Sequence, residues 1–327
     1  MYEPPYTITD PVLRTVGEIS EKVGRLDESR LLETHPVLRR NNRIRSVHSS
    51  LKIEANSLSL DEVRGVLNGQ SVVGPASEIQ EVKNAFAAYE QIGAFDPYRL
   101  QDLLRLHGVM TAGTVDESGM FRTGNEGVFN ADRCIFVAPP PERVPVLMED
   151  LFAWMNQNRQ RIHPLILSCV FHYEFVFIHP FKDGNGRMAR LWQTALLTKW
   201  NPIFQSMPIE SSIERFVQDY YSAIDACNHA GNSTAFLEFM LEKIDQTLSD
   251  VIARIGSESE LPEQFEKLLA VMDYGISYSA KSLMLSLGIS SRDGFRRNYL
   301  SPALAAGLIR MEFPDKPNSR NQRYMRV

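Results

Sequence analysis

The sequence predicts an all-α protein, and three observations lead to this fold class. Apolar residues recur three and four positions apart along most of the chain, as they do on one face of a helix. Proline and glycine residues interrupt these stretches, so each has the length of a single helix. Alternation of apolar and polar residues, which is typical of strands, is confined to a short hairpin before residue 138 and to the C-terminus.

Composition and charge indicate what kind of all-α protein this is. The chain has 327 residues, of which 43% are hydrophobic and 23% charged, so it can bury one large core and a smaller second one. Its net charge of −5 does not indicate nucleic-acid binding by the whole chain. The three cysteines are scattered, which argues against a disulfide framework or a zinc site and fits a reducing cytoplasm. The N-terminus lacks a signal segment and no apolar run has membrane-spanning length, so we expect a cytoplasmic protein without a membrane partner.

Five helices are expected before the hairpin. Asp10 and Pro11 open the first, because an acidic N-cap followed by proline is a common helix start. The second covers residues 36–55, and the third starts at Leu60 and ends at residues 68–69, Asn-Gly. Amphipathic spacing then predicts helices over residues 77–95 and 97–110.

A β-hairpin is expected in residues 119–137, where two short apolar pieces flank the polar turn 130–133. Three consecutive prolines, residues 139–141, end it, and a helix follows over residues 142–158. The remaining helices of this part are predicted over residues 164–178, 188–200, 211–230 and 234–254.

A separate C-terminal unit is expected after a polar linker at residues 256–259. Helices over residues 262–273, 279–287 and 291–306 precede strands over 308–313 and 322–327. This order resembles a winged helix, whose third helix and wing carry the basic residues Arg292, Arg296, Arg297, Lys316, Arg320 and Arg323. They are compatible with DNA binding, but acidic residues dilute them, so an interaction module is the favoured interpretation.

The chain is organised around residues 179–190, His-Pro-Phe-Lys-Asp-Gly-Asn-Gly-Arg-Met-Ala-Arg, which join two apolar helical runs. Pro180, Gly184 and Gly186 stop the first helix and start the second, so several backbone N–H groups converge at a helix N-terminus. The helix dipole adds partial positive charge there, and the two glycines let the backbone approach a bound anion.

Side chains in this stretch complete a site for phosphate chemistry. Arg187 and Arg190 lie three residues apart on the new helix, so both can face the turn. Asp183 offers a hard oxygen ligand for Mg²⁺, and His179 can act as a base because its unperturbed pKa is about 6.5. Together they predict phosphate-ester chemistry on a nucleotide. A plain connecting turn with a capping histidine is the alternative, but the length of the motif argues against it.

These twelve residues resemble the signature of Fic-domain proteins, His-x-Phe-x-Asp/Glu-Gly-Asn-Gly-Arg-x-x-Arg, and match it at every specified position. The resemblance implies a Fic helical core with a β-hairpin flap over residues 71–255, an N-terminal helical segment over 1–70 and a winged helix over 256–327. It also implies transfer of AMP from ATP, with Mg²⁺, to a Tyr, Thr or Ser hydroxyl of an unidentified target protein and of the protein itself.

The resemblance also implies roles for single residues. His179 removes the proton of the attacking hydroxyl, Asp183 holds the metal, and Asn185 and Arg187 hold phosphate oxygens. A Tyr-Tyr pair followed six residues later by Asn lies at the adenosine in Fic proteins, which points to Tyr221 and Asn228 here. The other implied nucleotide-binding residues are Gly184, Gly186 and Arg190, with Val128 and Phe129 on the inner edge of the flap.

A further resemblance concerns the end of the second helix. Ser50, Glu54 and Asn56 match the motif Ser/Thr-x-x-x-Glu-Gly/Ala-Asn of Fic proteins with an N-terminal inhibitory helix, with Ala55 where Gly is commoner. The resemblance implies that Glu54 pairs with Arg190, removes a cation from the γ-phosphate site and repels the nucleotide. A solvated helix-end carboxylate is the alternative interpretation of Glu54.

Other functions stay open at this point. A related Fic reaction, uridylyl or phosphoryl transfer, would use the same residues. Removal of AMP from targets would use Glu54 to align a water molecule. A nucleotide-sensing regulator would instead bind DNA through the winged helix. A homodimer is also compatible with the sequence.

Overall fold

The structure is a computed structural model that describes residues 2–29, 36–130, 133–259, 262–272, 277–317 and 319–327. Within these ranges the chain is mostly helical, with one two-stranded hairpin and one three-stranded antiparallel sheet. The prediction of an all-α protein with a small hairpin is therefore confirmed. No helix in the described ranges is both long enough and apolar enough to cross a membrane.

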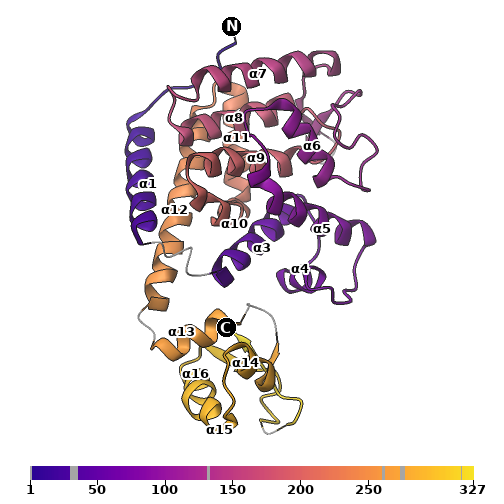
Figure 1. Cartoon of the computed structure of the whole chain (residues 1–327). Helices are drawn as coiled ribbons and strands as arrows, with labels where there is room; N and C mark the ends of the chain where they lie inside the picture. The colour runs from indigo at the N-terminus through magenta and orange to yellow at the C-terminus, as the bar shows by residue number, and fades with distance from the viewer. Residues whose placement is uncertain (1, 30–35, 131–132, 260–261, 273–276, 318) are drawn as a thin grey trace.

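The N-terminal helices belong to the main bundle. α1 (Asp10–Ser29) runs alongside α12 (Thr234–Ser259), and α3 (Pro36–Ile53) packs against α10 (Ile209–Arg215) and α5 (Ala76–Gln91) (Figure 1). One hydrophobic core extends without interruption from buried residues of α1 to buried residues of α12. The described residues of the segment 2–70 therefore share the core of the residues that follow them.

Local signals explain the start and end of α4 (Leu60–Leu67). Ser59 accepts a hydrogen bond from the Glu62 N–H, and the Glu62 side chain accepts from the Ser59 N–H, which is a capping box. The helix ends at Asn68, and Gly69 follows with a φ of 71°. Next come α5, η1 (Ile92–Ala94) and α6 (Leu100–Met110).

The hairpin is shorter than predicted. β1 (Gly127–Asn130) pairs antiparallel with β2 (Arg133–Val137), whereas residues 119–126 form no strand. Ala138 N–H donates to the Glu126 carbonyl (3.1 Å) and closes the base of the hairpin. We call residues 127–137 the flap. After it come η2 (Pro141–Arg143) and α7 (Val144–Asn158).

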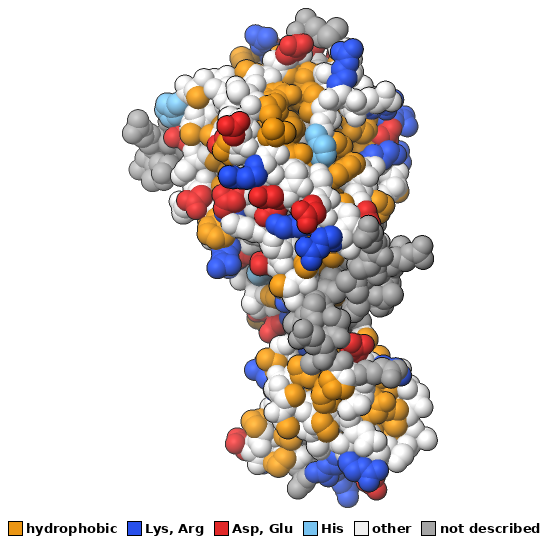
Figure 2. Space-filling model, turned by 90° about the vertical axis from the view of Figure 1, so that its left-hand side faces the viewer, with side chains coloured by type: hydrophobic (Ala, Val, Ile, Leu, Met, Phe, Trp, Pro, Cys, Tyr) orange, Lys and Arg blue, Asp and Glu red, His pale blue; other side chains and the backbone are white. Residues whose placement is uncertain are grey.

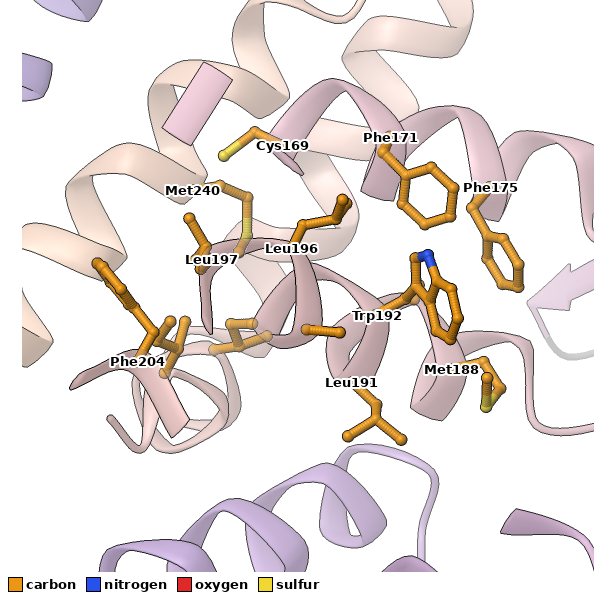
Figure 3. Close-up of a cluster of buried hydrophobic side chains, with 14 of the residues drawn as sticks. Cys169, Phe171, Phe175, Met188, Leu191, Trp192, Leu196, Leu197, Phe204 and Met240 are labelled. Atoms are coloured by element: carbon orange, nitrogen blue, oxygen red, sulfur yellow. The ribbon is translucent and has the colours of Figure 1, made fainter. Parts of the chain in front are cut away.

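Two helices form the centre of the bundle: α8 (Pro164–Ile178) and α9 (Asn185–Trp200). Figure 3 shows Trp192 of α9 beside Phe171 and Phe175 of α8, and all three are fully buried. Nearly every residue of both helices is buried, so neighbouring parts of the chain cover them on almost all sides. The loop between them contains the residues that the sequence singles out.

The predicted helix over residues 211–230 is two helices. α10 ends at Arg215, and Phe216, with φ −119° and ψ 39°, separates it from α11 (Val217–Ala230). No proline or glycine marks this break, so helical periodicity alone did not reveal it. η3 (Pro202–Ser206) joins α9 to α10.

The C-terminal unit has its own small core. Its sheet has the order β3-β5-β4, so it contains one strand more than predicted. The long predicted helix over residues 291–306 is divided, with a π-helical turn, η4, in its middle. The elements are α13 (Glu263–Ala270), β3 (Tyr278–Ser279), α14 (Ala280–Ser286), α15 (Arg292–Phe295), η4 (Arg296–Leu300), α16 (Ser301–Ala305), β4 (Ile309–Met311) and β5 (Arg323–Arg326).

The predicted linker at residues 256–259 is wrong, because α12 continues through Ser259. A single glycine lowers helix propensity by only about 1 kcal/mol, and no proline lies between Thr234, where α12 begins, and Pro262. Figure 2 shows the C-terminal unit as the smaller lobe at the lower end of the molecule.

A chain that ends at Ser259 should therefore keep the fold of the larger unit. The two cores share no residue, and α13 of the smaller unit contacts α3 of the larger one. We expect the melting temperature of the larger unit to change by no more than about 4 °C, the shift that roughly 1 kcal/mol causes at this size. Circular dichroism melting measures it; a molten or insoluble product would show that the small lobe completes the core.

Candidate active site

The loop between α8 and α9 begins with a residue in a left-handed conformation. His179 has φ 50° and ψ 60°, which few non-glycine residues adopt. Its N–H donates to the Phe175 carbonyl (2.9 Å) and so ends α8. Burial lowers the pKa of His179 below its usual value, so the imidazole is neutral at pH 7. Nδ1 lies 3.4 Å from the Val176 carbonyl, which can only accept, so we assign the proton to Nδ1 and the free lone pair to Nε2.

Asn185 shapes the loop with its side chain. Its Oδ1 accepts from the Phe181 N–H (2.9 Å), and its Nδ2 donates to the Phe181 carbonyl (2.7 Å). Both polar atoms of the amide therefore bond to the loop backbone, and the contact of Asn185 with phosphate oxygens stays a prediction. Asn185 is also the first residue of α9, so its own N–H lies in the first helical turn, whose N–H groups lack intrahelical partners.

Asn185→Ala should lower the free energy of unfolding by about 1–3 kcal/mol, because it leaves a buried N–H and a buried carbonyl of Phe181 unsatisfied. Asn185→Asp is the matched comparison, since it keeps the acceptor for the N–H and replaces the donor to the carbonyl by a carboxylate oxygen. Urea denaturation of the three proteins measures the effect. Equal stability of Asn185→Ala and the parent would contradict the assigned role.

His107 of α6 contacts the same loop through its imidazole ring. Its Nδ1 accepts from the Gly119 N–H (2.9 Å), so the proton is on Nε2, which donates to the Asp183 carbonyl (3.1 Å). The ring stacks on Phe181 with centroids 3.6 Å apart. Burial lowers the pKa of His107 to about 4, so a neutral imidazole fixes the backbone at Asp183.

Asp183 and Arg187 form an ion pair one helical turn apart. Arg187 Nη2 donates to Asp183 Oδ2 (2.7 Å), and the Gly184 N–H donates to Oδ1 (2.6 Å). Burial alone would raise the pKa of Asp183, but the Arg187 charge and these hydrogen bonds outweigh burial and hold it below its usual range. The Asp183 side chain is 51% exposed, so an ionised oxygen ligand is accessible at the loop.

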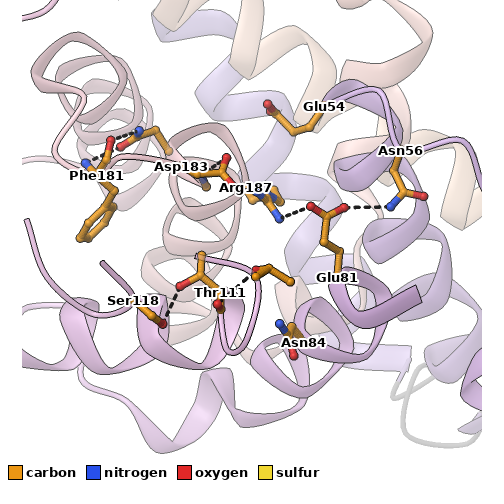
Figure 4. A network of polar contacts seen from close by, with 12 residues as sticks. Glu54, Asn56, Glu81, Asn84, Thr111, Ser118, Phe181, Asp183 and Arg187 are labelled. Atoms are coloured by element: carbon orange, nitrogen blue, oxygen red, sulfur yellow. Dashed lines mark hydrogen bonds and ion pairs between the residues drawn. The ribbon is translucent and has the colours of Figure 1, made fainter. Parts of the chain in front are cut away.

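A second carboxylate faces Arg187 from α5. Glu81 Oε1 lies 3.4 Å from Arg187 Nη1, and Asn56 Nδ2 donates to Glu81 Oε2 (3.0 Å) (Figure 4). Glu81 thus joins Arg187 to the segment that follows α3. Among the described side chains, no group of three or more His, Cys, Asp or Glu is arranged to hold a metal ion.

Arg190 is buried, and α3 holds its guanidinium. Nε donates to Ser50 Oγ (3.0 Å), and Nη2 donates to the Ser50 carbonyl (2.9 Å) and to Glu54 Oε1 (2.7 Å). Burial would lower the pKa of Arg190, but the Glu54 carboxylate outweighs it and raises the pKa. The Glu54 side chain is 37% exposed, so the ion pair lies at the edge of the site rather than in the core.

The Glu54 carboxylate lies against the N-terminus of α9. A Cβ atom at Gly186 would overlap Glu54 Oε1 and lie 3.1 Å from Arg190 Nη1, so a side chain here would displace the Glu54 carboxylate from this position. Within the described ranges, Nε of Arg187 and Nη1 of Arg190 have no hydrogen-bond partner although both are buried. Buried cationic donors without partners, beside a helix N-terminus, form an anion site. Glu54 occupies one edge of it.

The two residues predicted to contact the base lie on α11, two helical turns apart. Tyr221 is 45% exposed. Burial raises its pKa, and the charges of Glu54 and Arg190 act on it as well, so Tyr221 lies beside the anion site. Asn228 Oδ1 accepts a hydrogen bond from the Tyr173 hydroxyl (2.9 Å), which orients the amide.

The flap residues are placed only by their backbone. Val128 pairs with Phe136 and Phe129 pairs with Cys134, with a β-bulge between the two positions. The side chains of Val128 and Phe129 lie outside the described part of the structure, so their contacts with a nucleotide stay a prediction.

Three residues at the site were not found from the sequence: Glu81, His107 and Arg122. Arg122 is 2% exposed, and its Nε donates to the His179 carbonyl (2.7 Å). Each of the three is a single residue outside any motif, and only the folded chain brings it to the loop. The run Gly-Met-Phe-Arg that ends at Arg122 offered the one weak signal, a charge directly after an apolar pair.

The chain matches known families in two places. Residues 97–197 match the Fic/DOC family, and residues 263–326 match the C-terminal domain of the Filamentation induced by cAMP protein Fic-like family. Similar proteins include protein adenylyltransferase Fic of Drosophila virilis, 28% identical over 82% of this chain and 55% of the relative, and protein adenylyltransferase fic-1 of Caenorhabditis elegans, 27% identical over 78% and 51%. The chain thus spans about half the length of these relatives.

Solved structures agree with the fold. The crystal structure of a Fic family protein from Desulfovibrio desulfuricans G20 is 42% identical, covers 100% of this chain and 98% of its own, and superposes with a TM-score of 0.74. A Fic domain containing signaling protein from Bacteroides thetaiotaomicron, 20% identical over 78% of this chain and 100% of its own, shares the fold with a TM-score of 0.61.

Proposed function

The chain belongs to the Fic family, and we propose that it is a protein adenylyltransferase that moves AMP from ATP to a hydroxyl of a target protein and of itself. The observation that carries the proposal is the set of buried guanidinium donors without partners, Arg187 Nε and Arg190 Nη1, beside the glycine-containing N-terminus of α9. Such donors favour an anion with several oxygens, as the phosphates of ATP provide.

Mg²⁺ fits the residues at this loop. The metal prefers one or two carboxylates together with phosphate oxygens and water, and Asp183 presents one ionised, half-exposed carboxylate beside the phosphate donors. Asp183 would hold the ion, which would neutralise charge on the phosphates when bound. Arg187 pairs with Asp183, so it would lie beside the metal ion and donate hydrogen bonds to the same phosphate groups.

His179 would act on the attacking hydroxyl. Its Nε2 carries the lone pair and would take the hydroxyl proton, while the hydroxyl oxygen forms a bond to the α-phosphorus and the bond from that phosphorus to pyrophosphate breaks. Because burial lowers the pKa of His179, the imidazole is in the required neutral form at pH 7. Arg187 and the first N–H groups of α9 would stabilise charge on the departing pyrophosphate.

The remaining residues would orient the nucleotide. Tyr221 offers a half-exposed aromatic face beside the anion site, and Asn228 offers an amide held by Tyr173. The flap, with Val128 and Phe129 on β1, would position the target segment by adding it as a strand.

We further propose that Glu54 inhibits the reaction. Its carboxylate lies against Gly186 and pairs with Arg190, so it stands where an anionic phosphate group would bind. It pairs with the Arg190 guanidinium, which is then not available to a phosphate, and its negative charge repels the phosphates of the nucleotide. Ser50 strengthens this arrangement, because it holds Arg190 toward α3 through two hydrogen bonds.

Intact-protein mass measurement tests the proposed activity. The chain with Glu54→Gly is incubated with Mg²⁺ and either ATP, UTP or CTP, and a mass increase of one AMP with ATP alone supports adenylyl transfer. An increase with UTP or of one phosphoryl group would favour the related Fic reactions. If a target that already carries AMP loses it only when Glu54 is present, the chain instead removes AMP from its targets.

DNA binding through the C-terminal unit is the second candidate function. Arg292, Arg296 and Arg297 are exposed on α15 and η4, and Figure 2 shows Lys and Arg side chains gathered at the far end of the smaller lobe. A gel shift with genomic fragments, in which replacing the three arginines by alanine removes the retarded band, would favour it. Equal bands would leave this unit as an interaction module.

A further inference from the structure

We propose that Arg122 is a positioning residue that holds His179 in its reactive conformation and fastens both ends of the flap to it. The inference rests on the proposed function in one respect only, because His179 must be the base for its position to affect the rate. No motif marks Arg122, and it follows from the hydrogen bonds of the folded chain.

Arg122 forms hydrogen bonds with both His179 and Pro180, one from its backbone and one from its side chain. Its N–H donates to the Pro180 carbonyl (2.9 Å), and its Nε donates to the His179 carbonyl (2.7 Å). His179 has a left-handed backbone, which is unfavourable for a residue with a Cβ and persists only where neighbours hold it. The two bonds from Arg122 fix the peptide planes on the C-terminal side of His179.

The rest of the guanidinium reaches the flap. Nη1 donates to the Gly124 carbonyl (2.8 Å), just before β1, and Nη2 donates to the Pro139 carbonyl (2.5 Å), just after β2. Only arginine presents several N–H donors in a planar fork that reaches three carbonyls at once. One side chain therefore couples the flap, which would position the target, to the base that would activate the target hydroxyl.

The charge of Arg122 adds an electrostatic effect. The side chain is buried at the C-terminus of α8, where the helix dipole favours a cation. Burial is the main cause of the lowered pKa of His179. The Arg122 charge lowers it further, while the hydrogen bond to Val176 and the charges of Glu126 and Glu54 raise it. Arg122 thus helps to keep the base unprotonated.

Two variants separate geometry from charge, each made together with Glu54→Gly. Arg122→Lys keeps the charge and loses the fork, so kcat should fall roughly 10- to 100-fold, as for a misplaced catalytic group, while KM for ATP and the acid limb of the pH profile stay in place. Arg122→Met loses both, so kcat should fall and the acid limb should also move to higher pH. NMR titration of the His179 imidazole should show the same rise in pKa in Arg122→Met and none in Arg122→Lys.

Arg326→Met is the matched control, because Arg326 is also buried and donates to a backbone carbonyl, that of Leu269, in the other lobe. It should leave kcat and the pH profile unchanged.

Variants of Arg122 with the parent kcat, or a His179 pKa that is the same in Arg122→Met as in the parent, would overturn the proposal. Should Arg122→Met fail to fold, Arg122→Gln removes the same charge. A Glu54→Gly chain that transfers no AMP would instead contradict the proposed function, while the NMR titration would still test the position of Arg122.

Discussion

Glu54→Gly should transfer AMP, to itself and to targets, about tenfold or more faster than the intact chain. The substitution removes the carboxylate that lies against Gly186 and pairs with Arg190. A charged hydrogen bond contributes about 1.5–3 kcal/mol, which corresponds to roughly 10- to 100-fold in an equilibrium. Because Glu54 is 37% exposed, water screens the pair, and we expect the lower part of that range. The mass shift per protein over time, with ATP and Mg²⁺, measures it.

Three further variants show why Glu54 slows AMP transfer. Glu54→Gln keeps the size of the side chain and removes the charge, so it should recover part of the increase if repulsion of the phosphates matters. Arg190→Ala should not reach the rate of Glu54→Gly, since it removes the inhibitor's partner together with a phosphate ligand. The double variant tests for one shared interaction, because independent sites would add. If Glu54→Gly and the parent are equally active on several targets, Glu54 is an ordinary surface carboxylate.

His179→Ala should reduce AMP transfer by about 10²- to 10⁴-fold, the usual loss for a general base. ATP affinity should change little, because His179 precedes the phosphate donors of α9 rather than belonging to them. His229→Ala is the matched control, since that imidazole is 78% exposed on α11. Calorimetry for ATP binding and mass measurement for transfer are run in parallel on the Glu54→Gly background. Transfer that survives in His179→Ala would exclude His179 as the base.

The pH dependence of transfer gives an independent check on His179. The base must be unprotonated, and burial lowers the pKa of His179. The rate should therefore be constant around pH 7 and fall as the pH drops through a value below about 6.5, the ordinary histidine pKa. A fall that sets in above pH 7 would indicate that the imidazole is better solvated, or closer to an acidic group, than the structure shows.

The sequence by itself determined the helical class and the loop that connects α8 to α9. Both depend on local features: the spacing of apolar residues makes α8 and α9, and Gly184, with a φ of 81°, starts α9 as a backbone that only glycine adopts easily. The charged side chains of the loop are close in sequence, so their proximity needs no knowledge of the fold.

Only the tertiary structure decided what surrounds that loop. Glu81 on α5 faces Arg187, His107 on α6 fixes Asp183, and Arg122 holds His179, although each lies 50 or more residues away from its partner in the chain. Such contacts depend on how helices pack, which no local pattern encodes. The same holds for Asn185, whose side-chain amide is turned toward the backbone of Phe181. Side-chain direction and burial, set by the neighbouring helices, separate the residues that shape this site from those free to bind.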